Sequence, residues 1–460
     1  MASVLFGFID SLNEGLEGAV NSLETEVDGA IAQLDAGVDL DDVLEQVGLA
    51  GGGEAELLAA YRKLEALAVV QTPAVLRTWV VEGRVVPAAC AGLCRAGPLR
   101  RAAGPLAKVL NGMGTALEQT DATPEELRAY AEQLVRHTEN GRAMLKLVQV
   151  EEVGARAQSL ALLRRVYPYK SSDLGRHLLS DPESIAALVE ILQTAGGSPW
   201  TADGEDGAEG AGGGGAVSTS VEATLCAECV RFLCLITKED EHVRTILAFQ
   251  DGVEALLAIV AQALGTLQSK ESALLLSIAA DACACVQQLA VAGAVVQKLM
   301  RENGQLGAVL KTLRCVATVS ATAPAVNARG LEALIVTLLD VIVAFANRSI
   351  AGAEAAANAA ALVQGTPLME AICVESLPAA HMSNDMKVRM IEVLVATLSA
   401  ADDGILRFLV QAPSGAPVLD GLVGLLLAEP TPLATRAALD RLLAAGLGRS
   451  AFVRDALVQG

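Results

Sequence analysis

Aromatic and histidine side chains are scarce in this chain of 460 residues. Aromatic residues make up only 3% of it, with two Trp, four Tyr and four His. Ligand pockets and catalytic sites draw heavily on these side chains, so their scarcity argues against an enzyme and against a bound cofactor or metal. The apolar 52% is mostly Ala, Leu and Val, small side chains that let helices pack closely. We therefore expect an all-α protein without catalytic activity.

Basic residues are also few. The formal net charge is −20, which excludes a nucleic-acid partner, because binding phosphate backbones needs clustered Lys and Arg. The imbalance is strongest at the start: residues 1–61 contain 13 acidic residues and no Lys or Arg, and the first base is Arg62. We interpret residues 1–61 as a separate acidic segment.

Three further absences bear on location. No basic residue precedes the short apolar run 4–6, as a secretory signal would require. No uncharged apolar stretch reaches the roughly 18 residues that a membrane span needs. The nine Cys lie within helix-like apolar stretches rather than at the regular spacings of a disulfide framework. These features predict a soluble, cytoplasmic protein.

The acidic segment contains one long apolar stripe. Its apolar residues recur at spacings of three and four, which predicts an N-terminal amphipathic helix. Two roles remain open: packing on the repeats or on another copy, and lying on a membrane surface. The acidic polar face argues against anionic lipid. The candidate membrane or partner contacts are Leu5, Phe6, Phe8, Ile9, Leu12 and Leu16.

An internal repeat follows. The apolar positions of 184–192 recur in 252–260 at an offset of 68, and again from residue 305 at a further offset of 53. A Gly-rich insert at 196–220 accounts for the longer offset and is predicted to be disordered; without it, the first offset is 43. Periods of 40–47 are typical of armadillo and HEAT repeats. We predict an armadillo/HEAT-like helical-repeat solenoid.

Each predicted unit has three helices, as in armadillo repeats. A long helix (for example 223–236 or 278–290) is followed by a short one (243–249 or 295–301) and then by a closing helix. Such a unit cannot bury its own apolar face, so neighbours must stack. Residues 137–460 carry this pattern. In 62–136 it is interrupted at Pro73, Pro87, Pro98 and Pro105, which indicates degenerate helical repeats.

The sequence signals for a catalytic or metal-binding site are weak. Cys226 and Cys229 form a CxxC followed by Cys234, but a zinc site needs two further ligands at comparable spacing. Buried thiols in a helical core are the favoured interpretation, with a metal or redox site as the alternative. The four His (His137, His177, His242 and His381) fall in different repeats, and none is paired at metal-ligand spacing.

Three blocks of residues 137–460 resemble a known family. Glu139-Asn140 precedes a Leu-rich helix and the step Val153-Gly154-Ala155-Arg156, residues 246–254 read ILAFQDGVE, and residues 408–414 read FLVQAPS. In this order they are similar to the armadillo-like globular head of Uso-type general vesicular transport factors, the Golgi vesicle tethers. Residues 1–136 and the Gly-rich insert depart from that pattern, and the family's coiled coil is not found in these residues.

The resemblance implies a vesicle-tethering head that docks membrane-traffic partners at the Golgi. The implied partners are a Rab-type GTPase, SNAREs and other tethers, together with peripheral membrane association and a homodimer. The alternative is an armadillo scaffold or adaptor outside membrane traffic, such as a cytoskeletal or ciliary scaffold or a chaperone regulator. In both cases the expected function is protein–protein interaction.

Overall fold

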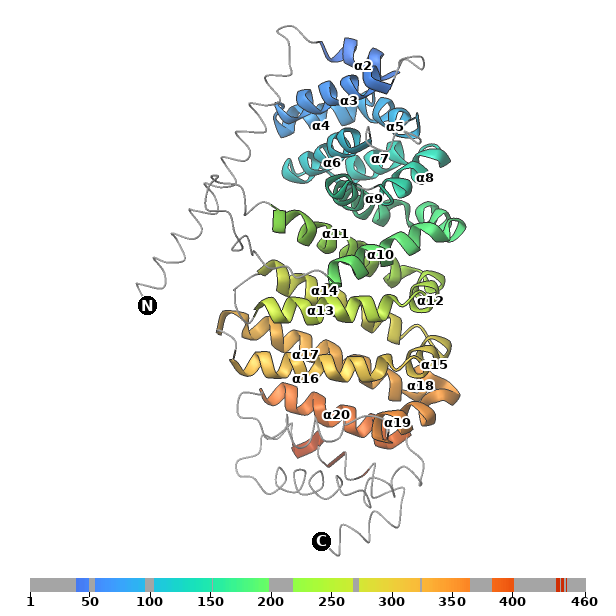
Figure 1. The fold of residues 1–460 in the computed structure, drawn as a ribbon, viewed down its shortest axis with the longest axis vertical. Coiled ribbons are helices and arrows are strands. Elements are labelled where there is room, and N and C mark those ends of the chain that lie inside the picture. Colours follow the sequence, from blue (N-terminus) through green and yellow to red (C-terminus); the bar gives the residue numbers. More distant parts are fainter. Residues whose placement is uncertain are drawn as a thin grey trace, which may run out of the picture. The chain divides into compact units, whose positions relative to one another are not determined.

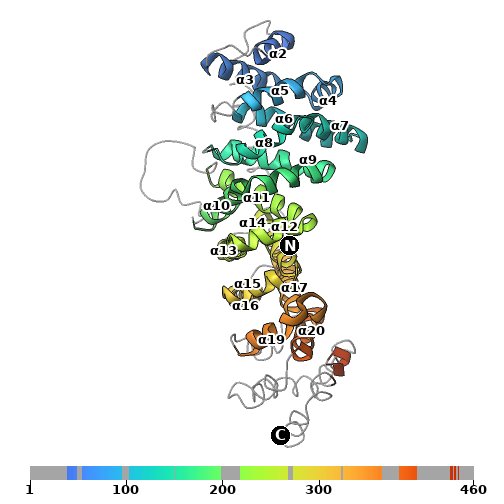
Figure 2. The same ribbon diagram turned by 90° about the vertical axis from the view of Figure 1, so that its right-hand side faces the viewer.

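The computed structural model describes residues 39–48, 54–95, 103–150, 152–197, 218–267, 273–322, 325–364 and 383–400, with six residues between 436 and 444. Almost all of these residues are helical, and no strand occurs among them (Figures 1 and 2). The chain divides into two compact units, unit 1 (Met1–Ser184) and unit 2 (Ile185–Gly460). Each unit is a stack of helical repeats.

Unit 1 contains three rows of helices. The first row is α2 (Leu40–Gly48), α5 (Val85–Arg95) and α8 (Thr138–Leu147). The second row is α4 (Pro73–Glu82) and α7 (Pro124–Leu134), joined by side-chain hydrogen bonds. The third row is α3 (Glu54–Val69), α6 (Ala103–Gln119) and α9 (Val153–Ser180). The first two repeats therefore contribute one helix to every row, and α8 and α9 continue the first and third rows.

Unit 2 follows the same plan. Its long-helix row is α11 (Ser218–Glu239), α14 (Ala273–Ala290), α17 (Ala325–Ala346) and α20 (Asn384–Ala400). A second row pairs α13 (Gly252–Leu267) with α16 (Gln305–Thr322). The third row holds α12 (Glu241–Phe249), α15 (Ala294–Glu302) and α19 (Ala355–Gln364), preceded by α18 (Arg348–Ala351) and η2 (Gly352–Glu354). The remaining helix, α10 (Pro182–Gly197), precedes α11.

Local sequence signals start and stop these helices. Thr123 and Glu126 form a capping box at the start of α7, and the Asp240 side chain accepts hydrogen bonds from two backbone amides of α12. Pro73 and Pro124 occupy the first turns of α4 and α7, where the missing amide hydrogen costs nothing. These two prolines therefore begin helices instead of interrupting them.

The rows bury their apolar sides against one another. Leu64, Leu110 and Leu163 are fully buried in unit 1, as are Phe232, Val286 and Leu338 in unit 2. Few of the buried side chains are aromatic, so closely spaced Leu, Val and Ala supply most of the buried surface. No single helix could donate such a core alone, which is why stability depends on the stacking of neighbours.

The predicted all-α, armadillo-like plan of three helices per repeat is confirmed, and the predicted long and short helices lie within α11, α12, α14 and α15. Helix α9 is kinked at Lys170, whose backbone is not helical. Starts of equivalent helices differ by 53 residues between α13 and α16 (252 to 305), as expected from their sequences.

Several predictions concern residues outside the described ones. They include the amphipathic helix with Leu5, Phe6, Phe8, Ile9, Leu12 and Leu16, and most of the Gly-rich insert. Helices α10 and α11 take up the first two and last three residues of the predicted insert 196–220. The division into 1–61, 62–136 and 137–460 stays a prediction.

Among the described helices, none alone has both the length and the apolar character to cross a membrane, although three bent helix pairs meet that test by length and composition.

Candidate interaction surface

The solvent-facing side of the long-helix row in unit 2 is the candidate surface, here called the long-helix face. On α14 the partly exposed residues recur every three or four positions: Ser277, Asp281, Ala284 and Gln288. This spacing keeps them on one side of the helix, opposite the buried Leu275, Ala279 and Val286. Equivalent stripes on α11, α17 and α20 extend the face over four helices.

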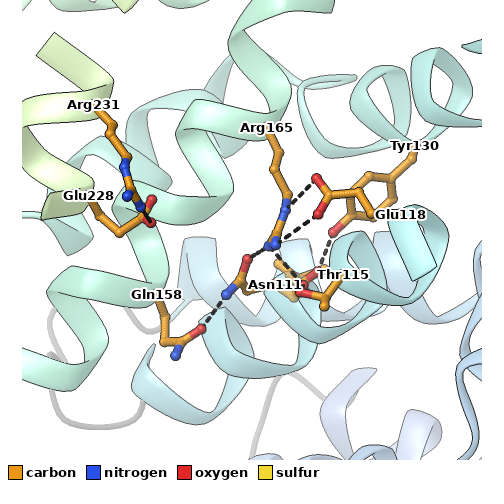
Figure 3. A network of polar contacts seen from close by, with 9 residues as sticks. Asn111, Thr115, Glu118, Tyr130, Gln158, Arg165, Glu228 and Arg231 are labelled. Carbon is orange, nitrogen blue, oxygen red and sulfur yellow. Dashed lines mark hydrogen bonds and ion pairs between the residues drawn. The ribbon is translucent and has the colours of Figure 1, made fainter. Parts of the chain in front are cut away.

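One polar bridge crosses this face between α11 and α14. The Arg231 guanidinium donates to Asp281 Oδ2 at 3.4 Å and to Ser277 Oγ at 3.2 Å. It also pairs with Glu228 Oε1 of its own helix at 3.3 Å (Figure 3). The guanidinium is thus held by two carboxylates at once, and the pairing fixes its planar donors in place.

A second bridge continues from α14 to α20. Gln287 Nε2 donates to Asp340 Oδ2 of α17 at 3.3 Å, and Arg389 of α20 lies 3.7 Å from the other oxygen of Asp340. Arg389 also donates to Glu392 at 2.9 Å. Nearer α11, Thr237 donates to Gln288 Oε1 at 2.5 Å, and Gln288 Nε2 points to Cys234 Sγ at 3.5 Å. Polar side chains therefore connect every neighbouring pair of long helices.

Small side chains lie between these polar bridges. Ala280 of α14 and Ala333 of α17 are exposed, and Ala284 is half-buried. Because Ala projects only a methyl group, the helix backbones are approachable there while charged side chains stand on either side. Such a face can accept another protein segment along its length, with the polar groups fixing its orientation.

The matching row of unit 1 has a comparable polar network (Figure 3). Arg165 of α9 pairs with Glu118 of α6 at 2.9 Å and donates to the backbone and side-chain oxygens of Asn111. Asn111 in turn donates to Gln158 Oε1. Lys108 of α6 lies 3.2 Å from Glu65 of α3. Buried Tyr130 donates to the Leu110 carbonyl beneath this network.

The thiols singled out in the sequence lie in the helical core. Cys226 and Cys229 are fully buried in α11, and Cys283 and Cys285 in α14. Burial raises the pKa of Cys226, Cys283 and Cys285 to about 12, which keeps them protonated and unreactive. The eight cysteines within the described ranges are all free of disulfides. The core-packing interpretation of the CxxC is supported by this burial.

No group of three or more metal-ligating side chains gathers among the residues that the structure describes. His137, His177 and His242 lie in α8's cap, α9 and α12 respectively, and His381 is outside the described residues. Burial and the nearby Arg142 and Arg176 lower the pKa of His177. The sequence-predicted contacts at 5–16 cannot be placed on any surface, since they also fall outside the described ranges.

The polar bridges were not found by sequence analysis, although a signal for them exists. Arg231 and Asp281 are 50 residues apart, Gln287 and Asp340 are 53 apart, and Asn111 and Gln158 are 47 apart. These separations all approximate one repeat. The internal repeat is recognised from apolar positions, whereas this face is marked by polar residues that recur at the same interval.

Rows of helices with this layout define an armadillo-like helical-repeat protein. Comparison with solved structures agrees: a crystal structure of Uso1-1 superposes with a TM-score of 0.59 at 15% sequence identity, over 92% of this chain and 62% of that chain. The chain thus spans less than two thirds of that structure. At this identity the likeness shows the fold alone.

Structures of SYS-1 alone and of the SYS-1/POP-1 complex are more distant, with TM-scores of 0.43 and 0.45. Both are 11% identical and cover 89% of this chain, and 75% and 73% of those chains. No protein-family model and no curated protein matches the sequence.

Proposed function

We propose that this protein is a non-enzymatic scaffold that binds another protein along the long-helix face of unit 2. The observation that carries the proposal is the set of polar bridges that crosses all four long helices and leaves Ala280 and Ala333 exposed between them. A broad face of repeated helices, with its charges already oriented, suits an extended protein segment better than a small substrate.

Within that class, we propose docking of membrane-traffic partners at the Golgi, with a cytoplasmic location and peripheral membrane association. Support comes from the sequence blocks that resemble Uso-type heads, one of which includes Ile246 to Glu254 of α12 and α13. A Rab-type GTPase, SNAREs and other tethers are the partners this proposal names. A scaffold outside membrane traffic is the competing proposal, and it uses the same face.

The role of the face is tested by enlarging its exposed alanines. Ala280→Arg and Ala333→Arg should weaken partner binding at least tenfold, because the bulky side chains block approach to the helix backbones. Ala258→Arg is the matched control, since Ala258 is also exposed but lies on α13, outside this row. The measurement is quantitative mass spectrometry of proteins recovered with the full-length chain from cells that express it.

Loss of the same partners with all three variants, or with none, would contradict the use of this face. The membrane-traffic proposal has a separate test. Purified chain is titrated with a panel of small GTPases in GDP and GTP forms; GTP-dependent binding of a Golgi member supports it. If no GTPase binds while the alanine variants still lose their partners, the scaffold outside traffic is the better description.

A further inference from the structure

Unit 1 carries a group of basic side chains at the contact between α8 and α9, here called the α8–α9 basic patch. Arg142 and Lys146 are one turn apart on the exposed side of α8. Arg176 is exposed on the last turns of α9, and His177 beside it packs against α8 so closely that a Cβ at Gly141 would lie 2.9 Å from the His177 ring. The two helices therefore bring Arg142, Lys146 and Arg176, together with His177, to one surface.

The patch is unusual because carboxylates outnumber bases in this chain, 54 to 34. Some other bases of unit 1 have an acidic partner, for example Arg77 with Glu126 and Arg165 with Glu118, whereas Arg128 and Arg136 have none among the described residues. Among the described residues, neither Arg142 nor Lys146 has an ion-pair partner. Arg176 pairs only with Asp173 of its own helix, at 3.4 Å. Uncompensated positive charge thus remains on this surface.

The charged groups around His177 are known from both helices. Arg142 of α8 and Arg176 of α9 disfavour its protonation, Asp173 favours it, and burial is the largest cause of its lowered pKa. An anionic group seated on the patch would reduce the repulsion between these bases. Glu139, exposed on the same side of α8, offsets part of this positive charge, and the remaining bases can accept an anionic group.

The chain itself contains a complementary segment. Residues 1–38 hold seven acidic side chains (Asp10, Glu14, Glu17, Glu24, Glu26, Asp28 and Asp35) and no Lys or Arg. This segment joins unit 1 at Asp39, immediately before α2. Helix α2 packs on α5, and α5 packs on α8 (Figure 1), so the patch is two helix-packing steps away, or about 20 Å. Even at about 1.5 Å per residue, the rise of an α-helix, 38 residues reach that far.

We propose that the acidic segment 1–38 docks on the α8–α9 basic patch of its own chain. Covalent tethering gives the segment an effective concentration in the millimolar range, which favours it over a second copy at ordinary protein concentrations. The contact occupies a surface of the α2/α5/α8 row, so it is independent of the long-helix face of unit 2. An acidic partner protein could bind the patch only by displacing the segment.

The test is zero-length cross-linking of the full-length chain with a carbodiimide, which joins lysine to a carboxylate that is in direct contact. We expect Lys146 to link to carboxylates of residues 1–38. Because the first base is Arg62, trypsin releases residues 1–62 as one peptide, and a second, Glu-specific digestion places the link before or after Asp39. Lys238, exposed on α11 of unit 2, is the internal reference and should not link to this peptide.

Charge changes and isotope mixing complete the test. Arg142→Glu should lower the yield of Lys146 links several-fold, whereas Arg128→Glu, an exposed change on α7 away from the patch, should leave it unchanged. In an equal mixture of ¹⁵N-labelled and unlabelled protein, links should join only like-labelled peptides. Equal yields at Lys146 and Lys238, equal effects of the two Arg variants, or mixed-label links would each overturn the proposal. Circular dichroism confirms that both variants fold.

Discussion

Neighbouring repeats are joined by charged groups in unit 1 and, at the most buried junction, by neutral amides in unit 2. In unit 1, Arg77 of α4 holds both carboxylate oxygens of Glu126, at 2.8 and 2.7 Å, and the Thr120 carbonyl at 2.8 Å. The Arg77 and Glu126 side chains are 31% and 25% exposed, so solvent and salt reach this bridge.

In unit 2, the polar side chains at the corresponding junction are fully buried. Gln297 of α15 is fully buried and donates to the carbonyls of Ala290 and Ala344, at 2.8 and 2.9 Å. Its oxygen accepts from Asn358 of α19, which is also fully buried and donates to the Phe345 carbonyl. Arg301 closes the network on the Asn358 oxygen. Every polar atom of the two amides is paired, as burial requires.

Neighbouring repeats are thus held in register in two ways, by a half-exposed ion pair in unit 1 and by a buried amide network in unit 2. Each repeat must fix its neighbour's rotation, and an apolar interface alone does so poorly. A half-exposed ion pair gives little stability and responds to salt and pH, whereas a buried amide network costs much when broken but responds to neither. The units can be followed separately, because Trp79 is buried in unit 1. Replacing the other tryptophan, Trp200→Phe, makes fluorescence a probe of unit 1 alone.

The largest expected effect is that of Gln297→Ala. The substitution leaves two backbone carbonyls and part of the Asn358 amide unpaired in the interior, at about 1–3 kcal/mol for each group. We expect unit 2 to lose at least about 3 kcal/mol in urea unfolding followed by circular dichroism, while the Trp79 transition stays in place. Gln287→Ala, which removes a half-exposed amide, should cost less than about 1 kcal/mol. Equal losses of unfolding free energy in the two variants would contradict the distinction between buried and exposed junctions.

A backbone test in unit 2 is expected to give the next largest effect. A Cβ at Gly252, at the start of α13, would lie 2.7 Å from the Leu247 carbonyl oxygen and also meet the Leu247 side chain. Gly252→Ala should therefore cost about 2–3 kcal/mol, because the α12–α13 corner must open. Gly265→Ala, in the same helix with nothing within 4 Å, should instead stabilise unit 2 by about 0.5–1 kcal/mol. Urea midpoints measure both, and a shift of the same sign in both would show that the corner is not tight.

The sequence predicted the helices of these repeats better than their junctions. Apolar residues recur at helical spacing in 223–236 and 278–290, so α11 and α14 were expected, and the turn at Asp240 has a cap that could be read directly. The junction residues could not be assigned in this way. Gln297 lies in a short, strongly amphipathic helix where a polar residue is expected to face water, and only the stacking of α15, α17 and α19 buries it.

The candidate surface was less predictable than the fold. Residues 5–16 and the cysteines carry local patterns, which made them the candidates from sequence. Arg231, Asp340 and Arg389 belong to a pattern whose interval is about 50 residues, and its members differ in residue type from repeat to repeat. Which residue of the next repeat a polar side chain contacts can be predicted only when the register in which the repeats stack is known.

The next smaller effect is the dependence of the stability of unit 1 on salt concentration. Arg77→Met removes the bridge to Glu126 and the bond to Thr120, and we expect unit 1 to lose about 1–2 kcal/mol in low salt. In 1 M NaCl the Debye length falls to about 3 Å, so the difference between variant and wild type should shrink. Urea is the denaturant of choice, because guanidinium would itself screen the bridge. A cost that does not change with salt would mean that hydrogen bonds to the backbone, rather than the ion pair, join α4 to α7.

Acid should have the smallest effect, again through unit 1. The Thr123 amide and then the Arg77 guanidinium hold the pKa of Glu126 below its ordinary value of 4.5. The unfolded chain therefore takes up this proton first, so the contribution of Glu126 is fully present above pH 4.5 and is lost as pH falls through the lowered folded-state pKa. We expect the urea midpoint reported by Trp79 to decline over this range in the wild type, and to decline less in Glu126→Gln. The Gln297–Asn358 pair has no proton to gain, so Asn358→Ala should lower the stability of unit 2 equally at pH 7 and pH 4. A loss that grew in acid would place a titrating group, such as the Glu354 that pairs with Arg301, at the centre of that junction.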